Sequence, residues 1–372
     1  MINVKYDTPY VLKTLSKVEV FIKYNILRPI ISFILWKIKQ NKENYFLDYN
    51  GKPLKEGISF CVPAYNEEHT ISFCLESLTG FIDHLIFIDN GSTDNTIDVV
   101  RAFQAKYQDL IEVTVLEMPG ATLIEMRQEA LKYVHHKWFV RGDADMMFTE
   151  AFKTECKQII DNAKRPIAIQ ISMFDLFGNV SHYHNRFGMY SNGEYYMRNF
   201  DSNVKYQEYS GRLEHAPLPT YYAMKKTKNR GFYHLNCFKP NERIFYRTRY
   251  LDWREYVNKH PEGQKSMEEY SKMWLQHNFK TNDEKELKYR FARLIGSMCE
   301  KHTDSFIAQY PFILKSLIEK DPYIITSKDG KPFLRYGRDE QAFFDSYQLT
   351  DSDSAWTPDV DKFYRDSIRM AI

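Results

Sequence analysis

Two acidic residues near the middle of the chain have the spacing of a metal-binding pair. In FVRGDADMMF, residues 139–148, Asp143 and Asp145 follow a short apolar run directly and are two residues apart. Gly142 eases a sharp turn there, so that both carboxylates can point to one place. Carboxylates suit hard divalent cations such as Mg²⁺ and Mn²⁺, which usually also bind substrate phosphate oxygens. Two acids at this spacing also occur by chance in surface loops, so the pattern needs its context.

A second polar stretch, DNGSTDNT (89–96), also follows an apolar run. A turn with a helix cap explains Gly91 to Thr93, but it does not explain an acid, Asp89, at the end of the apolar run. Asp89 can accept hydrogen bonds from a ribose or a base, and Asn90 can both accept and donate. This stretch therefore indicates a site for a nucleoside.

A third stretch, VPAYNEEHTI (62–71), has the same placement. Pro63 ends an apolar run, Tyr65 can stack on a base, and Glu67 stands at a helix start, where the helix dipole favours acids in any case. Turn and helix-cap preferences alone explain the order of residues in this stretch less well than they explain the other two stretches.

The elements that must position these stretches alternate along the chain. Short runs with strand character are separated by longer segments of helical period, which predicts βαβ units and a mainly parallel sheet flanked by helices. Ligands bind such sheets at the carboxyl ends of the strands, where all three polar stretches lie. The predicted strands are 58–62, 84–89, 111–117, 138–141 and 167–174, and the predicted helices are 67–79, 93–107, 121–134 and 149–163.

The alternation stops near residue 175, and this change predicts the domain organisation. Aromatic, turn-rich sequence follows and predicts irregular structure over an acceptor site; after residue 250, the stretches 262–279, 283–302 and 305–320 have helical character. We expect an N-terminal helical segment (1–50), a catalytic domain (51–250, with a donor half 51–175 and an acceptor half 176–250) and a helical C-terminal extension (251–372).

Composition excludes several classes of protein. The 372 residues are 43% hydrophobic, enough for a large core, and the net charge of +2 lacks the one-sided field of a dedicated nucleic-acid binder. Five cysteines without a CxxC pair argue against a disulfide framework or a zinc ribbon and fit a reducing cytosol. The first ten residues lack the apolar core of a signal peptide, so we expect a cytoplasmic protein.

The N-terminal stretch 21–38 is apolar with basic residues among and around its apolar ones. Its longest uncharged run, 29–36, is far shorter than the ~20 residues of a membrane span, so we expect no transmembrane helix. Two interpretations stay open: a helix packed on the domain, or an interfacial helix in peripheral contact with a membrane.

Together the three polar stretches resemble the family 2 glycosyltransferases. The resemblance covers roughly residues 57–175 and rests on VPAYNEEHTISFCLESL, IFIDNGSTDNT, EMRQEAL and FVRGDADM in that order. It implies the GT-A fold, a Rossmann-like sheet flanked by helices. It also implies transfer of a sugar from a nucleotide-diphosphate sugar, most often a UDP-sugar, to an acceptor hydroxyl, with Mn²⁺ or Mg²⁺ as cofactor.

Site residues carry over from the resemblance by position. It implies that Asp145 binds the metal directly and that Asp143 lies nearer the ribose or sugar. Arg127, in EMRQEAL, matches a helix arginine that faces the donor, although a surface arginine on an amphipathic helix is an equal alternative. The residues expected at the nucleotide are Pro63, Ala64, Tyr65, Glu67, Asp89, Asn90, Arg127 and Asp143.

Later residues complete the expected chemistry. His234 is expected to join Asp143 and Asp145 as a metal ligand, as a late-loop histidine does in many GT-A enzymes, with His215 as the alternative. An inverting enzyme needs a general base, for which Glu214 and then Asp201 are the candidates. A retaining enzyme would need none.

The acceptor stays open. A saccharide or a glycolipid is the expectation from the family, whereas the basic, aromatic loop 224–234 keeps a modified nucleic acid as an alternative. A binding module that kept the nucleotide site without catalysis is a further alternative, against which the paired acids argue.

Overall fold

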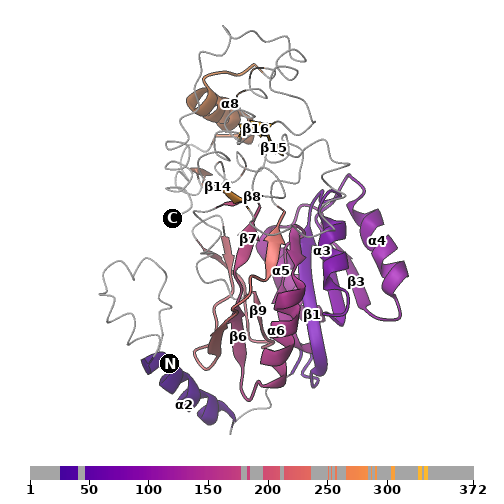
Figure 1. The fold of residues 1–372 in the computed structure, drawn as a ribbon, viewed down its shortest axis with the longest axis vertical. Helices are drawn as coiled ribbons and strands as arrows, with labels where there is room; N and C mark the ends of the chain where they lie inside the picture. The colour runs from indigo at the N-terminus through magenta and orange to yellow at the C-terminus, as the bar shows by residue number, and fades with distance from the viewer. Residues whose placement is uncertain are drawn as a thin grey trace.

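The computed structural model describes the donor half of the chain and parts of the remainder. The described residues are 26–40, 47–176, 182–184, 196–209, 213–235 and 265–283, single positions between 250 and 290, and three short strands beyond residue 300. Figure 1 shows the ribbon, with helix α2 (Arg28–Gln40) and helix α8 (Met267–Phe279) toward opposite ends of the long axis.

A seven-stranded sheet forms the centre of the fold. The strands lie in the order β12-β6-β9-β4-β1-β2-β3, and β9 is the one strand of these seven that runs antiparallel to its neighbours. The mainly parallel sheet predicted from the sequence is therefore confirmed. The strands are β1 (Lys55–Ala64), β2 (His84–Asp89), β3 (Glu112–Glu117), β4 (His136–Arg141), β6 (Ile167–Gln170), β9 (Met197–Asn199) and β12 (Ala223–Lys226).

Helices connect the parallel strands, as the alternating pattern requires. Two of the helices begin at threonine caps: the hydroxyls of Thr122 and Thr149 accept hydrogen bonds from backbone N–H groups of the first turn, which otherwise lack partners. The helices are α3 (Ile71–Leu78), α4 (Thr96–Tyr107), α5 (Leu123–Ala130), which continues into a 3₁₀ turn (Leu131–Tyr133), and α6 (Glu150–Asp161).

Strand alternation divides the core between the two faces of the sheet. Phe60 and Val62 of β1 point to a cluster built with apolar residues of α3, α4 and α6. Cys61, between them, points to the opposite cluster, where α5 contributes Met126 and Ala130. Successive side chains of a strand point to opposite faces, so a parallel sheet covered on both faces reads as a continuous apolar run.

A three-stranded sheet lies against the main one and departs from the sequence prediction. It has the order β5 (Met146–Phe148), β13 (Phe232–His234), β7 (Met173–Asp175). The single strand predicted over 167–174 is therefore two strands, with β6 in the main sheet and β7 in the small one.

The prediction of irregular structure after residue 175 is wrong in part, because β9, β12 and β13 all belong to sheets. Each is only three or four residues long, too short for a period-two pattern to be recognised. The same region holds the hairpin β10 (Gln207–Tyr209) with β11 (Leu213–His215), and β8 (His182–His184), which pairs with β14 (Thr303–Ser305).

Of the predicted C-terminal helices, α8 lies within the predicted stretch 262–279. Strand β14 includes Ser305, where a further helix was expected to begin. Most of the other predicted helical segments lie outside the described residues. A hairpin of β15 (Thr326–Lys328) and β16 (Lys331–Phe333) completes the described chain. No described helix is long and apolar enough to cross a membrane.

Candidate active site

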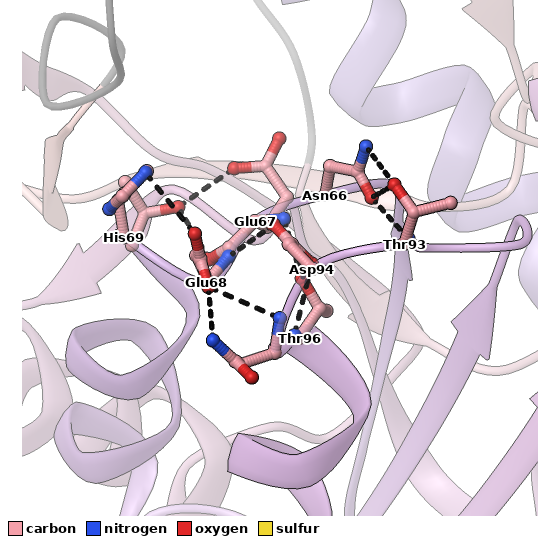
Figure 2. Close-up of polar contacts among 9 residues, drawn as sticks. Asn66, Glu67, Glu68, His69, Thr93, Asp94 and Thr96 are labelled. Carbon is pink, nitrogen blue, oxygen red and sulfur yellow. Dashed lines mark hydrogen bonds and ion pairs between the residues drawn. The ribbon is translucent and has the colours of Figure 1, made fainter.

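The loops that follow β1 and β2 are tied to each other by side chains, as Figure 2 shows. Asn66 adopts a positive φ of 55°, and its side-chain oxygen accepts a hydrogen bond from the backbone N–H of Thr93 at 2.7 Å. The backbone N–H of Glu67 donates to the hydroxyl of Thr96 at 2.7 Å, and that hydroxyl in turn donates to Asp94 at 2.5 Å. The stretches VPAYNEEHTI and DNGSTDNT therefore form one polar surface at the carboxyl ends of neighbouring strands.

Asp89 is the last residue of β2 and is 1% exposed. Its Oδ2 accepts hydrogen bonds from the backbone N–H groups of Gly91 and Ser92, both at 2.8 Å, which fixes the turn. Its Oδ1 is buried and has no hydrogen-bond partner among the described residues, and the side-chain oxygen of Asn90 is in the same condition. Buried acceptors without donors are costly, and the hydroxyls or N–H groups of a nucleoside would satisfy them.

The other residues expected at the nucleotide lie beside this turn. Pro63 and Ala64 are buried at the end of β1, and the carbonyl of Ala64 accepts the backbone N–H of Asn90 at 2.9 Å. Tyr65 is 44% exposed, so its ring has a surface on which a base could stack. Glu67 is half-buried, and its carboxylate accepts a hydrogen bond from Thr70 at 2.8 Å.

Arg127 lies beneath the acidic pair. Its guanidinium is fully buried, donates to the carbonyl oxygens of Gly142 (2.6 Å) and Cys61 (3.3 Å), and forms an ion pair with Asp143. Burial would raise the pKa of Asp143, but Arg127 and then Arg141 outweigh it and lower that pKa. Arg127 is thus not a surface arginine: it pairs with Asp143 and favours the ionised form of that carboxylate.

Gly142 is required where the chain passes over the core. A Cβ atom built on Gly142 would lie 1.9 Å from Cζ of Phe60, closer than any side chain can approach. The turn that presents Asp143 therefore depends on a glycine for lack of space, which is a different reason from the backbone flexibility inferred from the sequence.

The register of the small sheet brings three distant side chains together. Within it His234 of β13 pairs with Met146, next to Asp145, on one side and with Asp175 of β7 on the other. His234 Nδ1 lies 2.8 Å from Asp175 Oδ1, and His234 Nε2 lies 3.5 Å from Asp145 Oδ1. A further backbone bond, from Leu235 N–H to the carbonyl of Asp145 at 2.7 Å, fixes this approach.

The charges around His234 explain its titration. Burial alone would lower the pKa of the imidazole, but the charge and hydrogen bond of Asp145, together with Asp175, outweigh burial and raise the pKa to about 10. Between these two carboxylates the imidazole favours its protonated, cationic form. Two carboxylates and an imidazole are also a donor set that binds Mn²⁺ or Mg²⁺, so the residues present fit such an ion.

Not every expected site residue joins this group. Asp201 follows β9, whose antiparallel course carries it to the amino end of β4: the neighbouring Phe200 N–H bonds the carbonyl of Lys137 at 2.9 Å. There Asp201 accepts a hydrogen bond from Tyr221 and lies 3.7 Å from Lys39. Asp201 thus lies near the amino end of β4, whereas the acidic pair follows its carboxyl end, and the assignment of Asp201 as a general base is corrected.

Glu214 and His215 are placed only by their backbone, in β11, where Glu214 pairs with Glu208. Their side chains lie outside the described part of the structure. Glu214 therefore stays a prediction as the general base, and His215 as the alternative metal ligand.

Asp175 is the site residue that the sequence analysis did not identify. A signal was present, because Asp175 directly follows the predicted strand 167–174 and so repeats the pattern of an acid after an apolar run. The apolar run 167–174 divides into β6 and β7, which the sequence does not reveal. Only the tertiary structure shows that Asp175, at the end of β7, pairs with His234.

Comparison with known proteins finds similarity to glycosyltransferases. Residues 59–216 match the family model described as Glycosyl transferase family 2. A curated relative, the poly(ribitol-phosphate) beta-glucosyltransferase of Bacillus spizizenii, is 34% identical over 96 residues, which are 24% of this chain and 14% of that protein. The match thus spans only a small part of the relative's length.

Two solved structures are among those that match this chain. S. aureus TarS 1–349 in complex with UDP has a TM-score of 0.34 at 13% identity, over 75% of this chain and 96% of that one. The mannosyltransferase PcManGT from Pyrobaculum calidifontis, in complex with GDP-Man and Mn²⁺, has a TM-score of 0.35 at 12% identity, over 74% of this chain and 84% of that one. Scores this low do not align the sites.

Proposed function

We propose that the protein, whose residues 59–216 match the model described as Glycosyl transferase family 2, transfers a sugar from a UDP-sugar to an acceptor hydroxyl with a divalent metal ion. The observation that carries the proposal is the register of β5, β13 and β7, which gathers Asp145, His234 and Asp175 after the carboxyl end of β4. Asp143 stands in the same turn, and the Asp89 turn lies at the end of β2, two strands away.

The nucleoside would be held at the β1 and β2 ends. The unpartnered oxygens of Asp89 and Asn90 accept hydrogen bonds from the ribose or the base, and the exposed ring of Tyr65 stacks on the base. Because the loop after β1 is bonded to the loop after β2, this surface is formed before the ligand arrives. A preformed site loses less conformational entropy on binding.

Asp145 and His234 would hold the metal ion, with Asp143 next to it on the donor side. The ion supplies Lewis-acid stabilisation of the negative charge that grows on the departing nucleoside diphosphate. Arg127 favours the ionised form of Asp143 through their ion pair. Its hydrogen bond to the carbonyl of Gly142 holds the turn that carries Asp143.

Asp175 would act as a positioning residue for His234. With Nδ1–H donated to Asp175, the Nε2 of His234 faces Asp145 with its lone pair available once the second proton leaves. A carboxylate behind a ligand histidine fixes the tautomer and the ring orientation, and its loss typically lowers metal affinity about 10- to 100-fold. Asp175→Asn should therefore weaken Mn²⁺ affinity, measured directly, more than it changes affinity for free UDP.

The general base of an inverting reaction is proposed to be Glu214, as predicted from its Gly- and Pro-marked surroundings. Glu214→Gln should lower turnover by about 10²–10⁴-fold while UDP-sugar affinity changes little. Wild-type turnover in this variant would contradict the assignment.

The proposed acceptor is a hydroxyl on a saccharide, a glycolipid or a sugar-containing polymer. The supporting observation is the Bacillus spizizenii relative, whose name describes glucosyl transfer to poly(ribitol-phosphate). A nucleic-acid acceptor is the alternative, favoured by Lys225 and Lys226, which are exposed on the edge strand β12. Transfer to a polyol-phosphate polymer but not to RNA or DNA would separate the two.

A peripheral membrane contact through α2 is proposed as a separate element. Trp36 and Ser32 are buried and Lys39 bonds Tyr221 at 3.0 Å, so one face of α2 packs on the domain. The remaining faces expose apolar side chains beside basic residues, a composition that suits an anionic bilayer surface. The exposed apolar residues are Ile26, Leu27, Ile30, Ile31, Phe33, Ile34, Leu35 and Ile38.

Vesicle cosedimentation tests that contact. Ile31→Ser with Ile34→Ser should reduce binding to anionic vesicles, and Leu110→Ser, an exposed apolar residue elsewhere, serves as the control. Equal binding by both variants would contradict the proposal.

The central experiment is a screen of nucleotide sugars with Mn²⁺, read first as thermal stabilisation and then as release of nucleoside diphosphate. A ligand that binds only the folded state raises its stability, by about 2.7 kcal/mol at a hundred times Kd. Asp145→Asn should remove metal-dependent stabilisation and turnover, whereas Asp109→Asn, an exposed carboxylate, should change neither. Metal-dependent turnover that survives in Asp145→Asn would refute the proposed function.

A further inference from the structure

A cluster of three histidines lies at the amino ends of the parallel strands, whereas the candidate active site lies at their carboxyl ends. His84 is the first residue of β2, His136 is the first residue of β4, and His135 directly precedes it. Because β2 ends at Asp89, five residues later, the cluster is about 17 Å from the donor site along the strand. It therefore plays no direct part in the chemistry proposed above.

The three imidazoles are close enough to share one ion. One ring nitrogen from each lies within 4.8 Å of the corresponding nitrogens of the other two. The centroid of the His135 ring is 4.4 Å from that of His84 and 4.4 Å from that of His136. Three nitrogens around a tetrahedral zinc ion, at about 2.1 Å from it, would be about 3.4 Å apart, so modest rotation of the rings closes the set.

Protein partners occupy one nitrogen of each ring. His136 Nδ1 is 3.0 Å from the hydroxyl of Ser59, His84 Nε2 is 3.0 Å from the hydroxyl of Thr114, and His135 Nδ1 is 3.2 Å from the carbonyl of Tyr133. Such bonds orient the rings of metal-ligating histidines, and the bond to the carbonyl fixes the proton of His135 on Nδ1.

The other nitrogens of two rings are buried without hydrogen bonds. His84 Nδ1 has no partner among the described residues, although the side chain is only 1% exposed. His135 Nε2 lies 3.0 Å from a carboxylate oxygen of Glu112, but without the geometry of a hydrogen bond. A buried nitrogen lone pair without a donor is costly unless a ligand uses it.

Burial and neighbouring charges favour the neutral form of His84 and His136. Burial, followed by the neighbouring His135 and His136, lowers the pKa of His84 to about 3. Burial and His135 likewise lower the pKa of His136, although Asp83 and Glu112 oppose the shift. Neutral imidazole is the ligand form, so protons compete weakly with a metal ion at these two rings near neutral pH.

We propose that His84, His135 and His136 form a second metal site, which takes a divalent transition-metal ion of the zinc class. Imidazole nitrogens select such ions over Mg²⁺, which prefers oxygen. The carboxylate of Glu112, the first residue of β3, is placed to fill the fourth position or to balance the charge. The ion would join the amino ends of β2, β3 and β4, so its role is structural.

One of the three rings must rotate before their nitrogens can bind the same ion. His84 and His135 are stacked at 21°, an arrangement in which their in-plane lone pairs do not converge, so one ring must turn when the ion binds. His135 has a side chain 24% exposed and is the ring with room to do so. Its exposure also gives the ion a path from solvent.

Cobalt titration of the full chain tests the site. The protein, freed of transition metals and kept in excess Mg²⁺, is titrated with Co²⁺ and then with Zn²⁺ while the visible absorption of cobalt is followed. We expect about one equivalent of Co²⁺ to give the intense absorption of a tetrahedral site and Zn²⁺ to displace it. His135→Gln should weaken Co²⁺ binding at least tenfold, whereas His277→Gln, an exposed histidine on α8, should not.

The same titration in Asp145→Asn separates this site from the donor site. The cobalt signal should persist in this variant, because Asp145 follows the carboxyl end of β4 and the histidines lie at the amino ends of the strands. The result therefore holds whether or not the proposed transferase activity is correct. A weak octahedral spectrum in the wild-type chain would overturn the proposal even if His135→Gln failed to fold. Equal affinities in the wild type and in a folded His135→Gln would overturn it as well.

Discussion

Replacing the buried Arg127 by methionine should reveal how much the turn around Asp143 depends on it. Methionine fills the space of the aliphatic stem but donates no hydrogen bond. The carbonyl of Gly142 then loses its donor, while the carbonyl of Cys61 keeps the backbone N–H of Gly142 at 2.9 Å. One buried acceptor without a partner costs about 1–3 kcal/mol.

The loss of the ion pair adds to this cost. Breaking a fully buried pair costs about 3–5 kcal/mol, but Asp143 is 35% exposed, so solvent screens its charge and we reduce this term to about 1 kcal/mol. The sum predicts a loss of about 2–4 kcal/mol in the free energy of unfolding. For a domain of this size that corresponds to a fall of roughly 4–16 °C in the unfolding midpoint.

Thermal and urea unfolding, followed by circular dichroism, measure this change. The matched control is Arg101→Met. Arg101 is exposed on α4 and its side chain bonds only Gln104 among the described residues, so its loss should cost less than about 0.5 kcal/mol. A double-mutant cycle with Asp143→Asn then isolates the coupling between Arg127 and Asp143. If Arg127→Met unfolded within about 1 °C of Arg101→Met, the supporting role of Arg127 would be refuted.

Three further predictions follow from single contacts. Gly142→Ala should destabilise the protein by about 1–3 kcal/mol because its Cβ meets the ring of Phe60, and Gly142→Ala with Phe60→Leu should recover part of the loss in urea unfolding; no recovery would contradict the steric cause. Asp89→Asn preserves an acceptor for the turn but removes the charge facing the nucleoside, so calorimetry should show at least about tenfold weaker UDP binding with unchanged stability; unchanged affinity would remove Asp89 from the site. Thr122→Ala removes the capping box that Thr122 forms with Glu125 and should cost about 1 kcal/mol, an effect that a serine at this position should largely restore.

The sequence by itself determined the parallel sheet and the strand ends that carry the site. Apolar runs of four to eight residues alternating with helical segments leave few topologies, and in each of them the acids at the carboxyl ends of β1, β2 and β4 lie close together. Asp89, Asp143 and Asp145 could therefore be placed together from local pattern alone.

Only the tertiary structure decided which later residues join them. Strands β7, β9, β12 and β13 are three or four residues long, so their pairing depends on neighbours that are remote in sequence and not on their own pattern. That pairing brings Asp175 and His234 to Asp145, and the antiparallel course of β9 takes Asp201 to the opposite edge.

Burial, too, was decided by the tertiary structure. A residue's spacing on a helix does not show whether its charge faces water or a carboxylate in the protein. The sequence is therefore compatible with Arg127 either as a surface arginine or as one that faces the donor. The three histidines show the same limit: His84 is 51 residues before His135 and 52 before His136, and parallel strand pairing alone makes them neighbours.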